Sequence, residues 1–312
     1  VKGEVGKRCA VEVGVGEPLP KGADAVVPYE RCEVGAGWIK VFQPIPKRAN
    51  VYGVGEKIKK GKRLFDRGRA LKPYDLHVLA TIGYRKVRVI RKPRVGVLST
   101  GDELTELGES KNGKAVVNSS KFMLEELLRS YCVEVNYLGI ARDDLNEILT
   151  FIRRGIEEND MVITTGGTGL GRKDYVVKAV KELDPSLMIH GFKIRPAKPT
   201  AIALVNGKPV VMLSGVPGAA FVGFELIGRP ILLKLMGRNE ARPRVRGKLT
   251  ERIPPKKAKR AVRVNIFEKN GEILIEPNPN VCNGILLVEE GKGHNKGEEV
   301  EAILIFSAME RR

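Results

Sequence analysis

The chain has 312 residues, of which 42% are hydrophobic and 29% are charged, and its formal net charge is +18. Single hydrophobic cores stop growing near about 250–300 residues, so at least two domains are expected. No apolar run approaches the ~18 residues of a membrane-spanning helix, which argues against an integral membrane protein. The positive charge attracts anions, but it does not distinguish nucleic acid, phosphorylated small molecules and oxyanions.

The termini and the cysteines indicate a cytoplasmic protein. The first residues lack the apolar stretch of a secretory signal, and they also lack a starting Met, as in a chain that begins partway through a longer polypeptide. The four cysteines form no Cys-x-x-Cys pair, which is typical of free thiols in a reducing compartment. Gln43 is the only glutamine, a composition that fits a thermophile and accounts for part of the basic excess.

The first 91 residues divide into two segments. Residues 1–43 alternate short apolar runs with Gly and Pro turns, which predicts a partial β-rich domain with strands near Ala10–Val13, Ala25–Val27 and Trp38–Phe42. Residues 44–91 are basic and rich in loops, and one short helix is expected over Pro73–Ile82. We interpret this second segment as a connecting region or part of a small domain.

Residues 92–237 alternate apolar strands with amphipathic helices. Three successive pairs are predicted: Arg94–Ser99 with Ser119–Tyr131, Val133–Gly139 with Leu145–Glu158, and Met161–Thr164 with Tyr175–Leu183. A hairpin of Thr200–Leu204 and Pro209–Leu213 and a helix over Ala219–Met236 complete the unit. The pattern predicts an α/β domain with a doubly wound, mostly parallel sheet.

The second of these helices, Leu145–Glu158, has a clear start signal, because Asp144 is a good N-cap and Glu147 stands three residues on, as in a capping box.

After the α/β segment, residues 238–312 begin with a basic stretch, Arg242–Arg263. Four predicted strands follow, Val262–Phe267, Glu272–Glu276, Ile285–Val288 and Val300–Ile305. They predict a small C-terminal β domain.

Ligands of doubly wound sheets bind beyond the carboxyl ends of the strands, so the loops at those ends are the candidate site. The first follows Arg94–Ser99 and contains Thr100, Gly101 and Asp102. Gly101 permits a sharp turn, and Asp102 would present a carboxylate at the edge of the sheet. The alternative is a solvated turn in which Asp102 only forms the turn.

The loop that follows the predicted strand Met161–Thr164 is rich in glycine and indicates an anion site. Backbone N–H groups approach a ligand closely where side chains are absent, and threonine hydroxyls add donors. A plain tight turn is the alternative interpretation. The loop residues are Thr164, Thr165, Gly166, Gly167, Thr168, Gly169 and Gly171, followed by Asp174.

Two further segments carry groups that suit anions. Lys193, Arg195 and Lys198 would line one face of an extended segment and could clamp a diphosphate or an oxyanion, although a solvated basic strand is equally consistent. Ser214 and Gly215 follow the last strand and precede a helix, so they are a second candidate anion site of the same kind as the glycine loop. Together the loops suit a ligand with two or more anionic groups, plus a metal.

Several motifs in order resemble the molybdopterin molybdenumtransferase family, to which the gephyrin E domain belongs. The motifs are residues 16–27, the run Arg94–Leu104, the glycine loop 165–169 and the segment Arg195–Pro199. The resemblance implies a molybdopterin-binding α/β domain with β-rich flanking domains, acting as a homodimer. It also implies an enzyme that transfers molybdate, or tungstate, onto the dithiolene of adenylylated molybdopterin, with Mg²⁺ assisting and AMP released.

By the same resemblance, Gly166, Gly167, Thr168 and Gly169 would hold the phosphate of the pterin, and Lys193, Arg195 and Lys198 would neutralise phosphate or oxyanion. Asp102 and Asp174 would carry the catalytic and metal-holding roles, with Thr100, Gly101 and Thr165 beside them. Ser214 and Gly215 would offer a second anion seat. The implied partners are adenylyl-molybdopterin, a second copy of the chain and other proteins of molybdenum cofactor biosynthesis.

The chain departs from the family pattern at several positions. Val117 replaces an acid, Arg172 stands where the glycine loop usually continues into an acid, and Ser214-Gly215-Val216-Pro217 replaces Pro-Gly-Asn-Pro. The family's N-terminal Asp-Gly-Tyr-Ala motif is absent. These changes favour a second reading, a homologue that binds molybdopterin or a protein partner without catalysis.

A third reading is an RNA-binding protein, based on the charge and on the stretch Arg242–Arg263. Only 5% of the residues are aromatic, and none interleaves with this stretch, whereas stacking on bases needs aromatic side chains. Nucleic acid is therefore a disfavoured partner.

Overall fold

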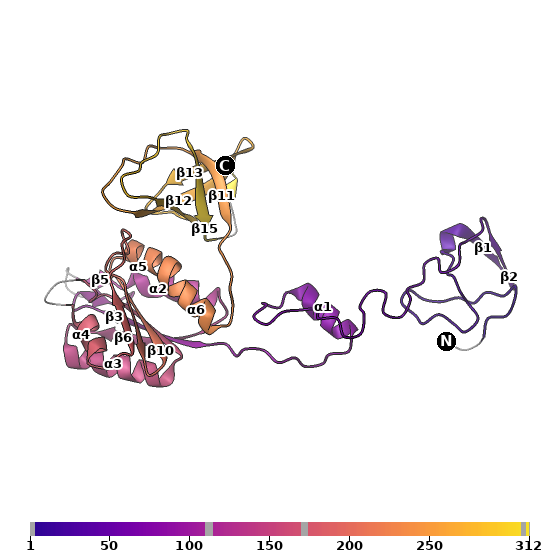
Figure 1. The fold of residues 1–312 in the computed structure, drawn as a ribbon, viewed down its shortest axis with the longest axis horizontal. Helices are drawn as coiled ribbons and strands as arrows, with labels where there is room; N and C mark the ends of the chain where they lie inside the picture. The colour runs from indigo at the N-terminus through magenta and orange to yellow at the C-terminus, as the bar shows by residue number, and fades with distance from the viewer. Residues whose placement is uncertain (1–3, 110–114, 170–173, 307–309, 312) are drawn as a thin grey trace. The chain divides into compact units, whose positions relative to one another are not determined.

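The computed structural model describes residues 4–109, 115–169, 174–306 and 310–311. Internal contacts divide the chain into two compact units, Val1–Asp66 and Arg67–Arg312. The second unit contains the α/β domain and the C-terminal β domain, each built around its own buried cluster (Figure 1).

The first unit contains a single β hairpin among its described residues. The 3-10 helix η1 (Tyr29–Arg31) leads into β1 (Cys32–Gly35), which pairs antiparallel with β2 (Trp38–Val41). The runs expected as strands at Ala10–Val13 and Ala25–Val27 are not strands. The unit extends past the expected limit at residue 43, because Val26 N–H donates to the Ala49 carbonyl at 3.0 Å and Asn50 Nδ2 donates to the Val26 carbonyl at 2.8 Å.

Helix α1 (Pro73–Thr81) lies where the sequence predicts a short helix, one residue shorter at its C-terminal end. Pro73 occupies the first turn, where no N–H partner is lost. Asp75 accepts hydrogen bonds from the Lys72 N–H at 3.0 Å and from Arg69 Nε at 2.9 Å. The bond from Arg69 is the main reason that the pKa of Asp75 falls to about 2.

The α/β domain is built on a six-stranded sheet in the order β6-β3-β7-β10-β9-β8. Strands β6, β3, β7 and β10 pair in parallel, and β9 pairs antiparallel with β10 and with the edge strand β8, so the sheet is mostly parallel, as predicted. The edge strand β8 was not expected. The strands are β3 (Arg94–Thr100), β6 (Glu134–Ala141), β7 (Met161–Thr165), β8 (Leu187–His190), β9 (Ala201–Val205) and β10 (Lys208–Leu213).

Helices cover both faces of this sheet, which confirms the doubly wound prediction (Figure 1). Alternate strand residues enter the two cores: Met161 and Ile163 pack on one face, and Val162 packs on the other. The first face carries α2 (Ser119–Arg129), α5 (Pro217–Gly223) and α6 (Arg229–Leu235), and the second carries α3 (Leu145–Glu158) and α4 (Tyr175–Lys181). None of the described helices is long and apolar enough to cross a lipid bilayer.

Two helix predictions need correction in detail. Asp144 does cap α3 by accepting the Glu147 N–H at 2.8 Å, but the Glu147 carboxylate accepts from the Arg142 N–H and so does not close a capping box. The single helix expected over Ala219–Met236 is interrupted by a π-helical segment, η2 (Phe224–Gly228). Pro230 has no N–H for a normal helical bond, which explains a change of helix type just before it.

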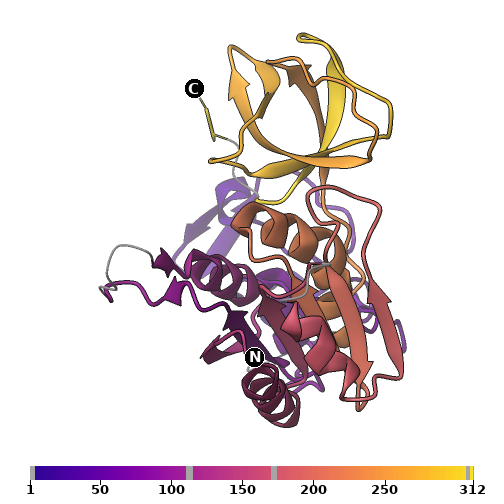
Figure 2. The same cartoon turned by 90° about the vertical axis from the view of Figure 1, so that its left-hand side faces the viewer.

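The C-terminal domain is a closed barrel of β strands, drawn in orange and yellow in Figure 2. It closes because β12 pairs with both β13 and β14, while β11 joins β13 to β15. Strand β11 falls inside the basic stretch and was not predicted. The strands are β11 (Arg244–Leu249), β12 (Arg260–Lys269), β13 (Glu272–Pro277), β14 (Gly284–Val288), β15 (Glu299–Leu304) and β16 (Glu310–Arg311).

Candidate functional site

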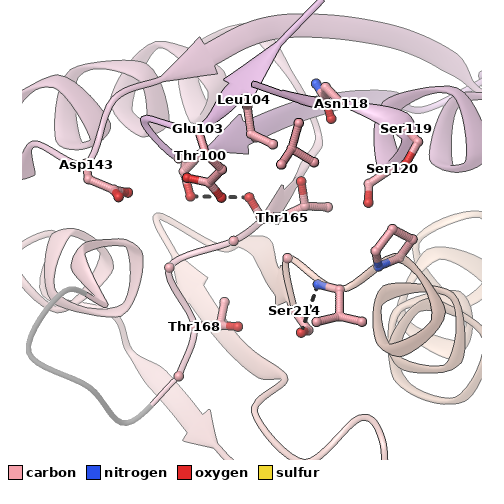
Figure 3. Close-up of a pocket in the computed structure, with 18 of the residues that line it drawn as sticks. Thr100, Glu103, Leu104, Asn118, Ser119, Ser120, Asp143, Thr165, Thr168 and Ser214 are labelled. Atoms are coloured by element: carbon pink, nitrogen blue, oxygen red, sulfur yellow. Dashed lines mark hydrogen bonds between the residues drawn. The ribbon is translucent and has the colours of Figure 1, made fainter. Parts of the chain in front are cut away.

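A cavity of about 440 Å³ lies at the carboxyl ends of β3, β7 and β10 (Figure 3). The chain leaves β3 for β6 on one side and then returns across β3 to β7 on the other, so the strand order reverses between β3 and β7. Open α/β sheets bind ligands at this reversal point, and the volume is in the range of small-molecule sites. Five loops, the short segment Val116–Val117 and the start of α2 contribute the walls.

The turn after β3 contributes Thr100, Gly101 and Glu103 to the lining. Gly101 has a φ of +146°, which a residue with a side chain rarely adopts. Asp102 is exposed and lies outside the lining, where its Oδ1 accepts the N–H of Asp143 at 3.1 Å. Glu103 is therefore the acid of this turn that reaches the cavity, and the role of Asp102 stays a prediction.

The glycine loop after β7 forms the next wall with Thr165, Gly166, Gly167, Thr168 and Gly169. Its glycines are required by space as well as by conformation. A Cβ on Gly166 would lie 2.4 Å from the carbonyl oxygen of Thr100. A Cβ on Gly167, whose φ is +59°, would lie 2.7 Å from Val176 in α4.

The far end of this loop is held by Asp174, which also lines the cavity. The Asp174 carboxylate accepts the Gly169 N–H at 2.7 Å. Arg172 and Gly171 lie outside the described residues, so the expectations for them are not addressed by the structure. The part of the loop that is described agrees with a seat for a ligand beside β7.

The loop after β10 completes the anion side of the cavity. Ser214, Gly215, Val216 and Pro217 line it, and the Ser214 hydroxyl accepts the Val216 N–H at 3.2 Å. Among the described residues, the N–H groups of Gly167, Thr168 and Gly215 donate to no acceptor in the protein. Such N–H groups are suitable donors to a phosphate or an oxyanion.

Three threonine hydroxyls around the cavity donate to acceptors within the protein. Thr100 donates to the carbonyl of Thr165 at 3.2 Å, and Thr168 donates to the carbonyl of Leu213 at 3.3 Å. Thr165 donates to Ser99 at 3.3 Å, while the Thr164 hydroxyl is buried with no partner among the described residues. A hydroxyl has one proton, so those that line the cavity offer it lone pairs.

A chain of polar side chains runs from this wall into the protein. Ser99 donates to Asn118 Oδ1 at 3.1 Å, Asn118 Nδ2 donates to the Tyr137 hydroxyl at 3.0 Å, and Tyr137 donates to Glu106 Oε1 at 2.6 Å. The hydrogen bond from Tyr137 lowers the pKa of Glu106, with a further contribution from Lys121. Burial and the Glu106 carboxylate raise the pKa of Tyr137.

Several lining residues were missed by the sequence analysis. Asn118, Ser119 and Ser120 line the cavity at the start of α2, just after the short strand β5 (Val116–Val117), which pairs with β4 (Leu104–Thr105). Asp143 lines it from the loop after β6. The signal was available, because the rule about carboxyl ends of strands applies to β6 as it does to its neighbours.

The basic segment lies outside the lining, in contrast to Pro199, which follows it. Lys193, Arg195 and Lys198 are all exposed. The segment is not extended, since the Phe192 N–H donates to the Lys198 carbonyl at 3.0 Å and closes a loop. The backbone of Arg195 instead pairs with β12, where its N–H donates to the Lys259 carbonyl at 3.0 Å.

Three carboxylates, those of Glu103, Asp143 and Asp174, line the cavity. In the described ranges, however, no three Asp, Glu, His or Cys side chains are grouped closely enough to hold a metal on their own. A preformed protein cage is therefore not present in this part of the chain. The acids fit an ion such as Mg²⁺, which is usually bound by one or two carboxylates together with substrate phosphates.

Many doubly wound α/β proteins have a polar cavity at this place, so the class is identified from the sequence of the domain. The sequence pattern of a probable molybdopterin binding domain matches residues 96–234, and that of the MoeA N-terminal region (domains I and II) matches residues 1–83. The first range lies within the expected segment 92–237, and the second spans the expected segment 1–43 and most of 44–91.

Similar proteins have names that agree with these two family matches. A putative molybdopterin biosynthesis protein of Methanocaldococcus jannaschii is 32% identical over 95% of this chain and 76% of its own length. A molybdopterin molybdenumtransferase of Staphylococcus aureus is 33% identical over 77% of this chain and 58% of its own length. The crystal structure of a MoeA protein from Pyrococcus horikoshii superposes with a TM-score of 0.82 at 28% identity, covering 98% of this chain and 78% of that one.

The chain belongs to the MoeA family of molybdopterin molybdenumtransferases, which are enzymes of molybdenum cofactor biosynthesis. The resemblance drawn from the motifs is thereby confirmed, as are the α/β domain and the β-rich flanking regions. The RNA-binding reading has no support from these relatives.

Proposed function

We propose that this chain inserts molybdate, or tungstate, into adenylylated molybdopterin and releases AMP. The observation that carries the proposal is the composition of one cavity. Gly167, Thr168 and Gly215, whose N–H groups have no acceptor among the described residues, line it together with the carboxylates of Glu103, Asp143 and Asp174. A substrate with a phosphoanhydride, together with an oxyanion, needs donors for its negative oxygens and a metal to neutralise the leaving group.

The phosphate is proposed to lie against the glycine loop, where Gly166 to Gly169 leave the backbone open. Ser214 and Gly215 form the second anion seat, directly beside the glycine loop. Thr100 and Gly101 complete the floor. Thr168 is buried, so its N–H would interact with charge more strongly than it would in solution, whereas Gly215 is exposed.

Asp174 is proposed to help hold Mg²⁺, and the turn after β3 provides a second acid. The sequence motif indicates Asp102 as this second metal ligand. Its neighbour Glu103 is the alternative, because Glu103 lines the cavity and Asp102 does not. Mg²⁺ would neutralise charge on the phosphates and on the departing AMP. The chain's own contribution is to orient the carboxylates: the Gly169 N–H fixes Asp174, and the Asp143 N–H fixes Asp102.

Lys193, Arg195 and Lys198 are proposed to draw oxyanions toward the site. Their exposure outside the lining supports attraction over distance more than direct contact with bound ligand. Such attraction weakens with salt, because the Debye length falls to about 8 Å at 0.15 M.

The proposal includes a homodimer in the cytoplasm of a thermophile, in contact with other proteins of molybdenum cofactor biosynthesis. These features follow from the family resemblance and from composition. Light scattering of the purified protein tests the dimer, and a monomer at micromolar concentration would contradict it.

A second candidate function is binding of molybdopterin without transfer. Val117 favours it, because this apolar residue lines the cavity at a position where the family usually has an acid. Transfer by the parent protein and by Val117→Asp separates the two. We expect the parent to transfer molybdenum, whereas activity in Val117→Asp alone would support the binding protein.

The substrate class is tested by measuring the equilibrium binding of molybdopterin. The intrinsic fluorescence of the pterin reports binding, and AMP and inorganic phosphate are added as competitors. We expect both anions to displace it, because they compete for the N–H groups of the two loops. Binding that neither anion disturbs would contradict the proposed phosphate seat.

A further inference from the structure

We propose that Glu106 and Tyr137 are positioning residues that make the Thr165 end of the cavity a hydrogen-bond acceptor, so that this end receives N–H donors of the pterin while anions bind at the glycine loop. The inference rests on the proposed function and extends it to the orientation of the substrate. It depends on the direction of each hydrogen bond in the chain from Glu106 to Thr165.

The direction is set at Glu106. Its carboxylate accepts from Tyr137 at 2.6 Å and from the Lys121 ammonium at 3.0 Å. Lys121 also lies over the ring of Tyr137, with Nζ 3.8 Å from the ring centre. An ionised carboxylate only accepts, so the single proton of the Tyr137 hydroxyl is committed to Glu106.

The commitment of that proton fixes the amide of Asn118, which is 2% exposed. The Tyr137 oxygen can only accept from Asn118, so the amide must present Nδ2 to it at 3.0 Å. The amide oxygen then faces Ser99, whose hydroxyl donates to it at 3.1 Å. Ser99 in turn accepts the proton of Thr165 at 3.3 Å.

The result is a cavity in which two neighbouring groups of residues have different hydrogen-bonding character. Thr165 directs its proton to Ser99, and Thr100 directs its proton to the carbonyl of Thr165, so both hydroxyls present lone pairs. Gly167 and Gly215, whose N–H groups have no acceptor among the described residues, line the cavity next to Gly166. A pterin ring carries several N–H donors, and its phosphate carries only acceptors at neutral pH, so the two groups favour one orientation.

The chain offers a variant that should reverse this polarity. In Glu106→Gln, the new amide can accept from Lys121 and donate to Tyr137, whose proton can then turn toward Asn118. An inverted Asn118 amide would donate to Ser99, and Ser99 would donate to Thr165, which frees the Thr165 proton for the cavity. Tyr137→Phe breaks the same chain by a different route, since it removes the partner of Asn118 Nδ2.

The experiment measures dissociation constants of free pterin and of inorganic phosphate for the full-length parent and for each variant. We expect pterin affinity to fall about tenfold in Glu106→Gln and Tyr137→Phe, with phosphate affinity unchanged within about twofold. The matched controls are Tyr131→Phe, another buried hydrogen-bonded tyrosine of this domain, and Glu272→Gln, which pairs with Lys248 at 2.6 Å in the C-terminal barrel. Neither control lines the cavity, and both should retain the parent ratio of the two constants.

The ratio of the pterin affinity to the phosphate affinity identifies a positioning role, because a loss of folding would weaken the binding of both ligands together. Equal losses for pterin and phosphate, or parent affinity for pterin in both variants, would overturn the inference. A parent that binds neither pterin nor molybdopterin contradicts the proposed function as well. A parent that binds molybdopterin beside unaltered variants contradicts this inference alone.

Discussion

Gly166 and Gly215 bring two loops into direct contact: a Cβ on Gly215 would lie 3.4 Å from the Cα of Gly166. The loops after β7 and β10 therefore share one wall of the cavity, although nearly fifty residues separate them. Because neither residue has a side chain, the two backbones can present N–H groups to the same ligand. The candidate anion seat depends on this contact.

Gly167→Val is expected to destabilise the protein as well as to weaken ligand binding. The left-handed φ of +59° and the 2.7 Å approach to Val176 both oppose a side chain. Together they are expected to lower the free energy of unfolding by about 2–4 kcal/mol. Gly215→Ala is the control, because its Cβ would make only an ordinary contact. Denaturant titration of both variants checks this, and an unaltered unfolding midpoint in Gly167→Val would contradict it.

The two acids of the β3 turn can be separated by substitution. We expect Glu103→Gln to raise the Mg²⁺ concentration needed for half-maximal transfer by about tenfold, since loss of one charged ligand contact costs roughly 1.5–3 kcal/mol. Asp102→Asn is expected to have a smaller effect, because its carboxylate lies outside the lining. Mg²⁺ titrations of transfer by both variants test this. A larger effect of Asp102→Asn would restore the assignment made from the motif.

The pH dependence of stability should reveal the ionised Glu106. Its pKa is lowered from 4.5 in the folded protein, first by the hydrogen bond from Tyr137. The stabilisation is therefore fully present above about pH 4.5 and is lost as the pH falls through the lower folded value. The difference in unfolding free energy between the parent and Glu106→Gln should accordingly shrink below pH 4.5. A difference that is constant from pH 7 to pH 3 would argue against this assignment.

A buried ion pair connects the α/β domain to the C-terminal strands. The Glu225 carboxylate is fully buried and accepts from Arg242 at 2.9 Å, and Arg242 also donates to the Ile305 carbonyl at 2.7 Å. Arg242→Ala leaves the Glu225 charge buried without this partner, so we expect a loss of about 3–5 kcal/mol in unfolding free energy.

Burial raises the pKa of Glu225, and the loss of Arg242 would raise it further. A carboxyl with a raised folded pKa is penalised above that pKa and is not penalised once protonated. The deficit of Arg242→Ala should therefore shrink as the pH is lowered. Thermal unfolding at pH 7 and pH 5 measures this, and a larger deficit at pH 5 would be the contrary outcome.

The helices and strands of the α/β domain could be predicted because each carries its own local signal. Helix α3 combines a cap at Asp144 with a buried stripe of Ile148, Ile152 and Ile156, so its bounds were predicted to the residue. Strand β11 was missed because its outward residues are basic, although Val245 and Leu249 alternate with them and face inward. The high content of basic residues therefore obscured the alternation of exposed and inward-facing positions that is typical of a strand.

The candidate site was only partly predictable, because it depends on contacts between distant segments. Sequence reasoning identified the glycine loop by its density of glycine, and Ser214 by its position directly after a predicted strand. It favoured Asp102 over Glu103, since nothing in a five-residue turn indicates which acid faces the cavity. It also expected donors from the threonine hydroxyls, although the direction of those protons is decided by acceptors such as the Leu213 carbonyl.

The central claim is most directly tested by single-turnover transfer. The full-length protein is mixed with adenylylated molybdopterin, Mg²⁺ and molybdate, and both AMP and dithiolene-bound molybdenum are quantified over time. The account predicts that AMP appears only when molybdate is present, in a one-to-one ratio with inserted molybdenum. Tight binding of the substrate with no AMP released at any Mg²⁺ or molybdate concentration would contradict it, and would identify the chain as a binding protein.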